Sequence, residues 1–458
     1  MCQMTFPETV ATQPELVAQH YTAAGCAAQA VHYWQRAGQH ASDRSANLEA
    51  MSHVTTGIEV LKTLPETSDR LQQAVALYIA LGAALQRANG LAAAEVEQAY
   101  THAYTLCRQV GETPELIPVL FGLWRFYLLR AQLHTARELG ETLLRLAHRA
   151  ADPALAVLAP YTLGATWFWL GGLPAARQHC EEGLARYTPT QHQARVFRMG
   201  QDPGVACRAI VAQILWLQGY PAQALARVHE ALALAHALAH PYSLVYAQGW
   251  ATIVAQVRRD GVAVQEQAET AVGLATTHGV RQWAANGAIL RGWARALQGH
   301  GEEGLAQIRE GIAAFRATGA VLHVPYFCTL LADVADALGR PADGLQALAE
   351  AHTLVEQQEE RYWEAEVHRL RGVLLLRQSG TAQAEAETWL QRALDVARRQ
   401  EAKSLELRAA TSLSRLWQQQ GKRTEAHELL APIYGWFSEG FDTADLQEAK
   451  ALLEELGG

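Results

Sequence analysis

Three histidines in one short segment have the spacing closest to that of a metal site. His229, His236 and His240 fall within about 40° of one another if the segment is helical, and a pair of histidines four residues apart can chelate Zn²⁺. No fourth ligand and no glutamate placed as a general base accompanies them. The alternative is a polar helix face, exposed to solvent or set between helices, and we expect no bound metal.

Nucleotide chemistry is not supported by the lysines. A phosphate-binding loop needs GxxxxGK[ST], with glycines that bend around the phosphates and a lysine that reaches them. Of the four lysines (Lys62, Lys403, Lys422 and Lys450), only Lys422 follows a glycine, and Arg423 comes next. No GxSxG elbow and no strand-rich segment for a cyclase is present. We therefore predict a chain without catalytic residues and without a cofactor.

Charge, hydropathy and cysteine usage limit the partners and the compartment. The net charge of −8 argues against a nucleic-acid binder, which needs a basic stripe, and no apolar run is long enough to span a membrane. The N-terminus lacks a secretory signal, and the six cysteines are scattered without a CxxC pair. We expect a cytoplasmic protein whose partners are neither nucleic acid nor membrane.

Aromatic and polar side chains of the central region are the candidates for binding a partner. Rings that concentrate there could stack, together with two arginines, on a planar or anionic group. The alternative is that most rings fill space between helices. A Pro- and Gly-bearing loop near 188–204 adds Gln201 and Asp202, although Asp202 followed by Pro203 equally suits the cap of a helix. The candidate binding residues are Trp124, Arg125, Tyr127, Trp169, Gln201, Asp202, Trp250, Arg291 and Trp293.

The elements that position these residues are predicted to be helices in a repeat. Ala, Leu, Glu, Gln and Arg dominate, and turn residues recur before the second helix of each pair at spacings of 38 to 47 residues, by subtraction of their positions. These turns lie at Ala131, Gly172, Gly219, Gly261, Gly299, Gly339, Gly380 and Gly421. We expect about twenty helices in roughly ten antiparallel pairs.

A second pattern recurs inside the second helices. A small residue, an apolar residue four positions later and another small residue three positions after that share one helix face and allow close approach of a neighbour. Four of the eight such triplets are Ala50-Val54-Gly57, Ala176-Cys180-Gly183, Gly304-Ile308-Gly311 and Ala386-Leu390-Ala393. First helices carry a companion signature, as in Leu163-Gly164-Trp167.

These motifs resemble the tetratricopeptide family, although the period is nearer forty than thirty-four residues. Tyr33-Trp-Gln-Arg-Ala-Gly38, Gly122-Leu-Trp-Arg-Phe-Tyr127, Gly200-Gln-Asp-Pro-Gly204 and Gly440-Phe-Asp-Thr-Ala-Asp-Leu446 are similar to the C-terminal repeat region of bacterial proteins that join a class III nucleotide cyclase, a P-loop ATPase and such repeats. The resemblance implies a right-handed superhelical solenoid whose first helices line a concave face. It also implies a protein-interaction and sensing module, with cyclase or ATPase domains of a parent protein as possible partners.

We predict three ranges in the chain. Residues 1–45 form an atypical N-terminal pair, 46–440 the repeat array, and 441–458 a C-terminal capping helix. The preferred function is binding of a protein or peptide on the concave face. The alternative is a small-ligand receptor that uses an aromatic groove near residues 199–204.

Overall fold

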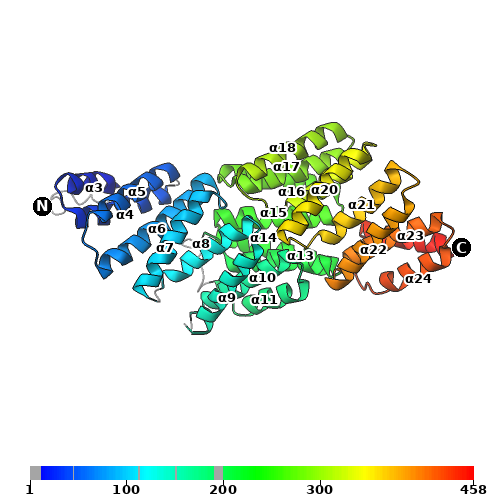
Figure 1. Cartoon of the computed structure of the whole chain (residues 1–458), viewed down its shortest axis with the longest axis horizontal. Coiled ribbons are helices and arrows are strands. Elements are labelled where there is room, and N and C mark those ends of the chain that lie inside the picture. The colour runs from blue at the N-terminus through cyan, green and yellow to red at the C-terminus, as the bar shows by residue number, and fades with distance from the viewer. Residues whose placement is uncertain (1–11, 45, 112–113, 150–151, 190–199, 458) are drawn as a thin grey trace. The chain divides into compact units, whose positions relative to one another are not determined.

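The computed structural model describes residues 12–44, 46–111, 114–149, 152–189 and 200–457. These residues form 22 helices and no strand, as the sequence predicts (Figure 1). Contacts divide the chain into two compact units. Unit 1 comprises residues 1–130 with 318–320, and unit 2 comprises 131–317 with 321–458. The predicted ranges 1–45, 46–440 and 441–458 describe repeat membership and stay predictions.

Unit 1 contains six described helices, and most of them pack as antiparallel neighbours. Its core joins Tyr33 and Trp34 of one helix to apolar residues of the helices on either side. The helices are α3 (Pro14–Ala23), α4 (Ala27–Asp43), α5 (Asn47–Lys62), α6 (Ser68–Asn89), α7 (Ala94–Val110) and α8 (Leu116–Leu129).

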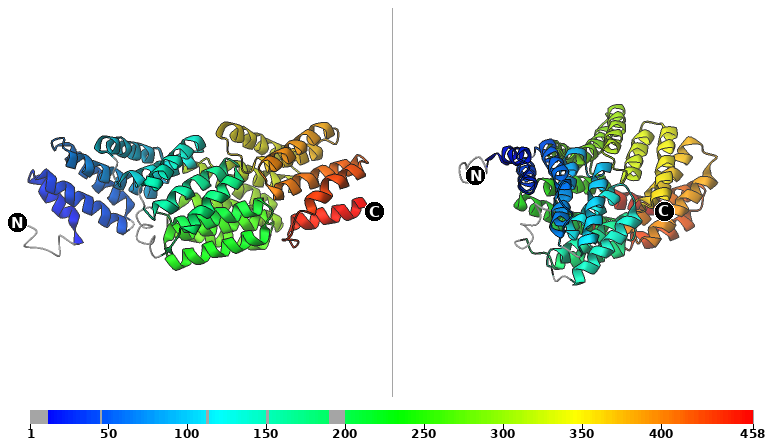
Figure 2. Two further views of the ribbon diagram at one scale, coloured as in Figure 1. Left: turned by 90° about the horizontal axis from the view of Figure 1, so that it is seen from below. Right: turned by 60° about the vertical axis from the view of Figure 1, so that its left-hand side comes forward.

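Unit 2 consists of stacked helix hairpins in which each helix packs on the next along the chain (Figures 1 and 2). Its first helices are α9 (Leu133–Arg149), α10 (Leu155–Trp169), α11 (Leu173–Ala185), α13 (Pro203–Leu217), α14 (Pro221–Leu238), α15 (Pro241–Val257), α16 (Gly261–Thr277) and α17 (Arg281–Leu297). It continues with α18 (Gly301–Ala317), α19 (Val324–Ala337), α20 (Pro341–Gln358), α21 (Glu364–Gln378), α22 (Gln383–Arg399), α23 (Lys403–Gln419), α24 (Arg423–Tyr434) and α25 (Ala444–Gly457).

The turns of unit 2 repeat more regularly than the spacing of the predicted turn residues indicates. Two residues before α9, α11, α14, α16, α18 and α20 the backbone enters the left-handed region, and this position recurs after 40 residues at four of the five steps from Ala131 to Gly339, by subtraction. The alignment placed two turns one or two residues late, at Gly172 and Gly261, because the left-handed residues there are Gly171 and Arg259. Arginine at this position hid the register, since glycine is the residue that favours it.

The small-residue triplets allow close helix contacts. A Cβ added to Gly38 would lie 2.5 Å from Val54 Cγ2, and one on Gly372 would lie 2.8 Å from Leu390 Cγ. A Cβ on Gly164 would collide with the sulfur of Cys180. Val54, Cys180 and Leu390 are the central residues of their triplets, so each fills the space that a glycine on the neighbouring helix leaves open.

The last helix, α25, covers the apolar face of the final hairpin. Leu446, Leu452 and Leu456 are buried in one cluster with Leu413 and Leu430 of α23 and α24. The helix lies within the range where a capping helix was expected. Without it, the last hairpin would expose this face, since an end hairpin has no further neighbour to bury it.

Candidate functional site

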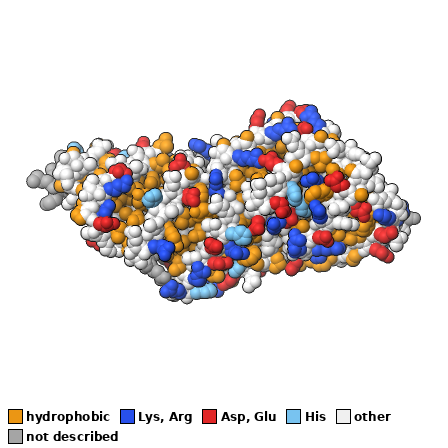
Figure 3. All heavy atoms as spheres, in the orientation of Figure 1, with side chains coloured by type: hydrophobic (Ala, Val, Ile, Leu, Met, Phe, Trp, Pro, Cys, Tyr) orange, Lys and Arg blue, Asp and Glu red, His pale blue; other side chains and the backbone are white. Residues whose placement is uncertain are grey.

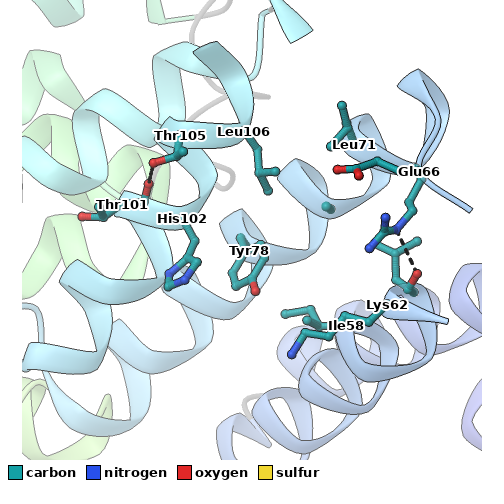
Figure 4. Close-up of a pocket in the computed structure, with 12 residues that line it drawn as sticks. Ile58, Lys62, Glu66, Leu71, Tyr78, Thr101, His102, Thr105 and Leu106 are labelled. Atoms are coloured by element: carbon teal, nitrogen blue, oxygen red, sulfur yellow. Dashed lines mark hydrogen bonds between the residues drawn. The ribbon is translucent and has the colours of Figure 1, made fainter. Parts of the chain in front are cut away.

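Unit 1 contains a pocket lined by side chains of three consecutive helices. It has a volume of about 420 Å³, within the range typical of ligand sites, and it lies where α5 and α7 flank the first half of α6 (Figure 4). Most of its surface is apolar. The lining residues are Ile58, Leu61, Lys62, Glu66, Arg70, Leu71, Ala74, Tyr78, Thr101, His102, Thr105 and Leu106.

The floor of the pocket comes from one face of α6. Leu71, Ala74 and Tyr78 are three and four residues apart, so they follow one another along that face, and each is partly exposed. Ile58 and Leu61 close one side from α5, and Leu106 closes the other from α7. In the space-filling view, hydrophobic side chains gather over the unit 1 helices, with basic, acidic and histidine side chains beside them (Figure 3).

Arg70 is held in place at the edge of the pocket. Its backbone N–H donates to the hydroxyl of Thr67, the N-cap of α6, at 3.2 Å. Its Nε donates to the carbonyl of Leu61 at 3.1 Å, near the C-terminal end of α5, where a cation is favoured by the helix dipole (Figure 4). Lys62 on the same side pairs with Glu59 at 2.7 Å on the exposed surface.

Two rings from different helices form the opposite part of the lining. The rings of Tyr78 and His102 stack at 5.2 Å between centroids with an interplanar angle of 11°. His102 Nδ1 lies 2.7 Å from the carbonyl of Gln98, and because a carbonyl only accepts, Nδ1 carries the proton of this bond. In the neutral ring the other nitrogen, Nε2, is therefore an acceptor.

No motif in the sequence predicts this pocket. Among its lining residues, Lys62 stands out only as one of four lysines, and it does not fit a phosphate-binding loop. The pocket depends on how α5 and α7 pack against α6, and this packing does not follow from the repeat pattern.

The candidate residues on α8 lie in the unit 1 core or at its edge. Trp124 and Arg125 are buried, and both contact the ring of Phe121. The Trp124 and Phe121 ring centroids lie 5.4 Å apart, and Cζ of Arg125 lies 5.6 Å from the Phe121 centroid. Tyr127 is partly buried and donates to Glu97 at 2.7 Å, and burial together with this bond raises its pKa to about 12. These side chains present little surface to a partner, so a binding role for them stays a prediction.

The candidate tryptophans of unit 2 are also buried, and they meet later parts of the chain. Trp169 and Trp250 lie 6.0 Å apart, and Trp169 contacts the rings of His323 at 5.1 Å and Tyr362 at 4.9 Å. The carbonyl of Trp169 accepts from the N–H of Arg361 at 2.8 Å. We call the residues Trp169, Trp250, His323, Tyr326 and Tyr362 the aromatic cluster.

A carboxylate and an imidazole are buried beside the aromatic cluster. Glu360 accepts hydrogen bonds from the N–H of His323 with both oxygens, each at 3.0 Å. Burial raises the pKa of Glu360 to about 8 and lowers that of His323 to about 3. His323 Nε2 and the Tyr362 hydroxyl are buried and have no hydrogen-bond partner among the described residues.

Hydrogen bonds at the ends of three helices connect the two halves of unit 2. The C-terminal carbonyls of α10, α13 and α15 all accept from residues far along the chain. The carbonyl of Trp169 accepts from the backbone N–H groups of Arg361 and Tyr362. The carbonyl of Trp216 accepts from the hydroxyl of Ser404, and that of Val257 from the guanidinium of Arg408 at 2.7 Å. Trp169 and Trp250 are buried in the core of unit 2, and a binding role for them stays a prediction.

Two of the remaining candidates, Asp202 and Trp293, have structural partners. Asp202 caps α13, accepting from the N–H of Val205 at 2.8 Å, and Pro203 occupies the first turn, so the cap interpretation is confirmed. Gln201 is buried, Trp293 donates to Asp333 at 2.8 Å, and Arg291 is partly buried. Residues 190–199 of the predicted loop lie outside the described part of the chain. The small-ligand groove near 199–204 stays a prediction.

The three histidines have different environments. His229 and His236 are exposed on α14, whereas His240 is buried at the N-terminus of α15 and accepts from the N–H of Ser243 at 3.3 Å. Across the described ranges, no three His, Cys, Asp or Glu side chains are arranged to hold a metal ion. The structure therefore does not bring the three together as a site.

Comparison with known proteins places the fold. No family model matches the chain. A crystal structure of a Rap protein complexed with Competence and Sporulation Factor is similar over 88% of this chain and 99% of that chain, with a TM-score of 0.54 and 14% identity. The structure of aspartyl phosphate phosphatase F from Bacillus subtilis aligns over 82% and 98%, with a TM-score of 0.43 and 12% identity. The chain has a tetratricopeptide-like helical-repeat fold.

One curated protein shares detectable sequence similarity. It is an uncharacterized protein of Rhizobium meliloti (strain 1021), 24% identical over 403 residues. The match covers 87% of this chain and 39% of the relative, so the chain spans about two fifths of the length of that protein. Among the described helices, none combines the length and the apolar character that crossing a bilayer requires.

Proposed function

We propose that the chain is a non-catalytic binding module that holds a segment of a protein or peptide partner. The observation that carries this proposal is the apolar pocket of unit 1, built on a repeat scaffold in which α5 and α7 pack on either side of α6. Helical repeats offer extended surfaces of this kind to peptides. The Rap protein of similar fold was solved in complex with Competence and Sporulation Factor, and this supports the proposal by its fold.

We further propose that the module serves a cytoplasmic bacterial signalling protein. A relative more than twice as long as the matched segment supports an arrangement in which such repeats adjoin other domains. Following the resemblance in the sequence, a class III cyclase and a P-loop ATPase are the domains we would expect there. In that arrangement, occupancy of the pocket would be the signal that the repeats pass on.

Peptide selection on the whole chain tests the function. Random dodecapeptides displayed on phage are panned against the immobilised folded chain, with the urea-unfolded chain as the counter-selection. Enriched peptides are then synthesised, and their dissociation constants are measured by calorimetry. We expect peptides that bind the folded form at micromolar concentrations and raise its melting temperature, because a ligand specific for the native state stabilises it. Recovery of only peptides that bind both forms would contradict the proposal.

A further inference from the structure

We propose that the α5–α7 pocket takes a peptide segment in which a bulky apolar side chain adjoins an acidic one. This inference rests on the proposed function and specifies its ligand. The shape and polarity of the lining determine the apolar part. Its floor of Leu71, Ala74 and Tyr78 is flanked by leucine and isoleucine side chains, which suits a Leu, Phe or Trp side chain inserted from outside.

The charges on the lining determine the acidic part. Lys62 and Arg70 outnumber the single carboxylate of the lining, Glu66, in a chain of net charge −8. Only Nε of Arg70 is used in its bond to Leu61, which leaves the outer nitrogens of the guanidinium to donate to a ligand carboxylate. Lys62 is already paired with Glu59, an exposed contact that a second carboxylate can share.

The acceptors of the lining favour a peptide over a fatty acid or an aryl carboxylate. Glu66 and His102 Nε2 can accept hydrogen bonds, and the Tyr78 hydroxyl can both accept and donate. A peptide supplies backbone N–H groups to these atoms, whereas a simple carboxylic acid carries no N–H donor. Glu66 would repel a lone carboxylate, but it suits a segment that presents its amides and its acidic group at different points.

Defined peptides test this ligand class on the full chain. The probe is rhodamine-labelled Ser-Gly-Phe-Asp-Gly-Ser, and its fluorescence anisotropy is compared with that of the Phe-Asn and Ala-Asp versions. We expect each change to weaken binding at least tenfold. Thr105→Trp, which fills the pocket from its exposed rim, should weaken the Phe-Asp probe by at least tenfold as well.

Thr270→Trp is the matched control for the pocket variant. Thr270 is also an exposed threonine on a second helix, and both hydroxyls donate to the carbonyl four residues earlier at 3.0 Å. Thr270 lies in unit 2 and is not part of the pocket lining, so Thr270→Trp should leave probe binding unchanged. Arg70→Gln should weaken the Phe-Asp probe about tenfold and the Phe-Asn probe by less than twofold, because only the first carries the carboxylate.

Each contrary outcome identifies what fails. If phage-selected peptides bind the folded chain equally well in wild type and Thr105→Trp, the pocket assignment is overturned and the peptide-binding function stands. If no peptide selective for the folded chain is found, both the pocket assignment and the proposed peptide-binding function are wrong. If 4-phenylbutyrate displaces the Phe-Asp probe at equal concentration, the pocket is a site for small carboxylates and the peptide assignment is wrong.

Discussion

Apolar side chains have different surroundings in the two units. In unit 1, Leu71 and Tyr78 of α6 remain partly exposed because α5 and α7 stand apart over them. In unit 2, Trp169 and Trp250 are buried by Tyr362, His323 and their neighbours, which come from hairpins more than seventy residues away in sequence. Helix hairpins of the same kind therefore leave apolar side chains exposed or bury them, depending on whether hairpins distant in sequence pack over them.

This difference separates two sources of stability. A hairpin buries its small-residue triplet against its nearest neighbours, and that burial is available in both units. Unit 2 adds interactions between hairpins far apart in sequence, such as the bonds that Trp169, Trp216 and Val257 accept. We expect these long-range contacts to make unit 2 cooperative and the pocket of unit 1 adaptable.

Removing one ring from each unit should show the largest contrast. Trp169→Ala removes a buried indole that contacts the rings of Trp250, His323 and Tyr362, so we expect a loss of about 3–5 kcal/mol in the free energy of unfolding of unit 2. Tyr78→Ala only enlarges an open pocket and should cost unit 1 about 1 kcal/mol or less. Hydrogen exchange during urea unfolding reports each unit separately. Equal losses would remove the contrast.

A partly buried arginine provides the next test. Arg408 donates to Asp445 at 2.8 Å, to Glu366 at 3.3 Å and to the carbonyl of Val257 at 2.7 Å. Arg408→Met leaves these acceptors without their shared donor, and we expect unit 2 to lose about 2–4 kcal/mol in denaturant titrations. In unit 1, exposed Arg87 bonds Asn47 and Ser42, and Arg87→Met should cost about 0.5 kcal/mol. A loss below 1 kcal/mol for Arg408→Met would show that the packing between distant hairpins of unit 2 does not depend on this residue.

The buried carboxylate of unit 2 should make its stability depend on pH. Burial raises the pKa of Glu360 to about 8 in the folded state, so the folded form keeps a proton that the unfolded form releases above about pH 4.5. Stability from this group is thus full below pH 4.5 and falls as the pH rises toward 8. Between pH 5.5 and 7.5 the unfolding free energy of wild type should fall by about 2–3 kcal/mol relative to Glu360→Gln.

Comparing wild type with Glu360→Gln isolates the effect of the Glu360 carboxyl group on the free energy of unfolding. His323, whose pKa burial lowers to about 3, acts in the opposite direction, because its stabilising effect is full above about pH 6.5 and falls as the pH drops toward 3. It is present in both wild type and Glu360→Gln, so it cancels in the difference. A difference that does not vary between pH 5.5 and 7.5 would show that Glu360 is ionised in the folded protein.

The sequence predicted local features of the fold and missed those that depend on distant contacts. The turn at Gly219 and the close approach of Gly164 to Cys180 follow from residue type and spacing, and the cap by Asp202 was weighed correctly. The burial of Trp169 depends on Tyr362, and no periodic pattern reveals that pairing. The pocket depends on the separation of two helices, for which lining residues such as Leu71 carry no signature.

The smallest effects should come from the turns, where the two units follow the same rule. Glu401 has a φ of 57° and an exposed side chain, so Glu401→Gly should stabilise unit 2 by about 0.5 kcal/mol, because the left-handed strain of an L residue exceeds the entropy that glycine costs.

Gly279→Ala in unit 2 and Gly25→Ala in unit 1 should each lower the free energy of unfolding by about 0.5–1 kcal/mol. A Cβ at either glycine meets no atom within 4 Å, and the φ values of 68° and 70° are nearly equal, so backbone strain alone is measured. Hydrogen exchange and thermal melts give the three values. Equal losses at Gly25 and Gly279 would place the difference between the units in side-chain burial, whereas a loss confined to Gly279 would extend it to the backbone.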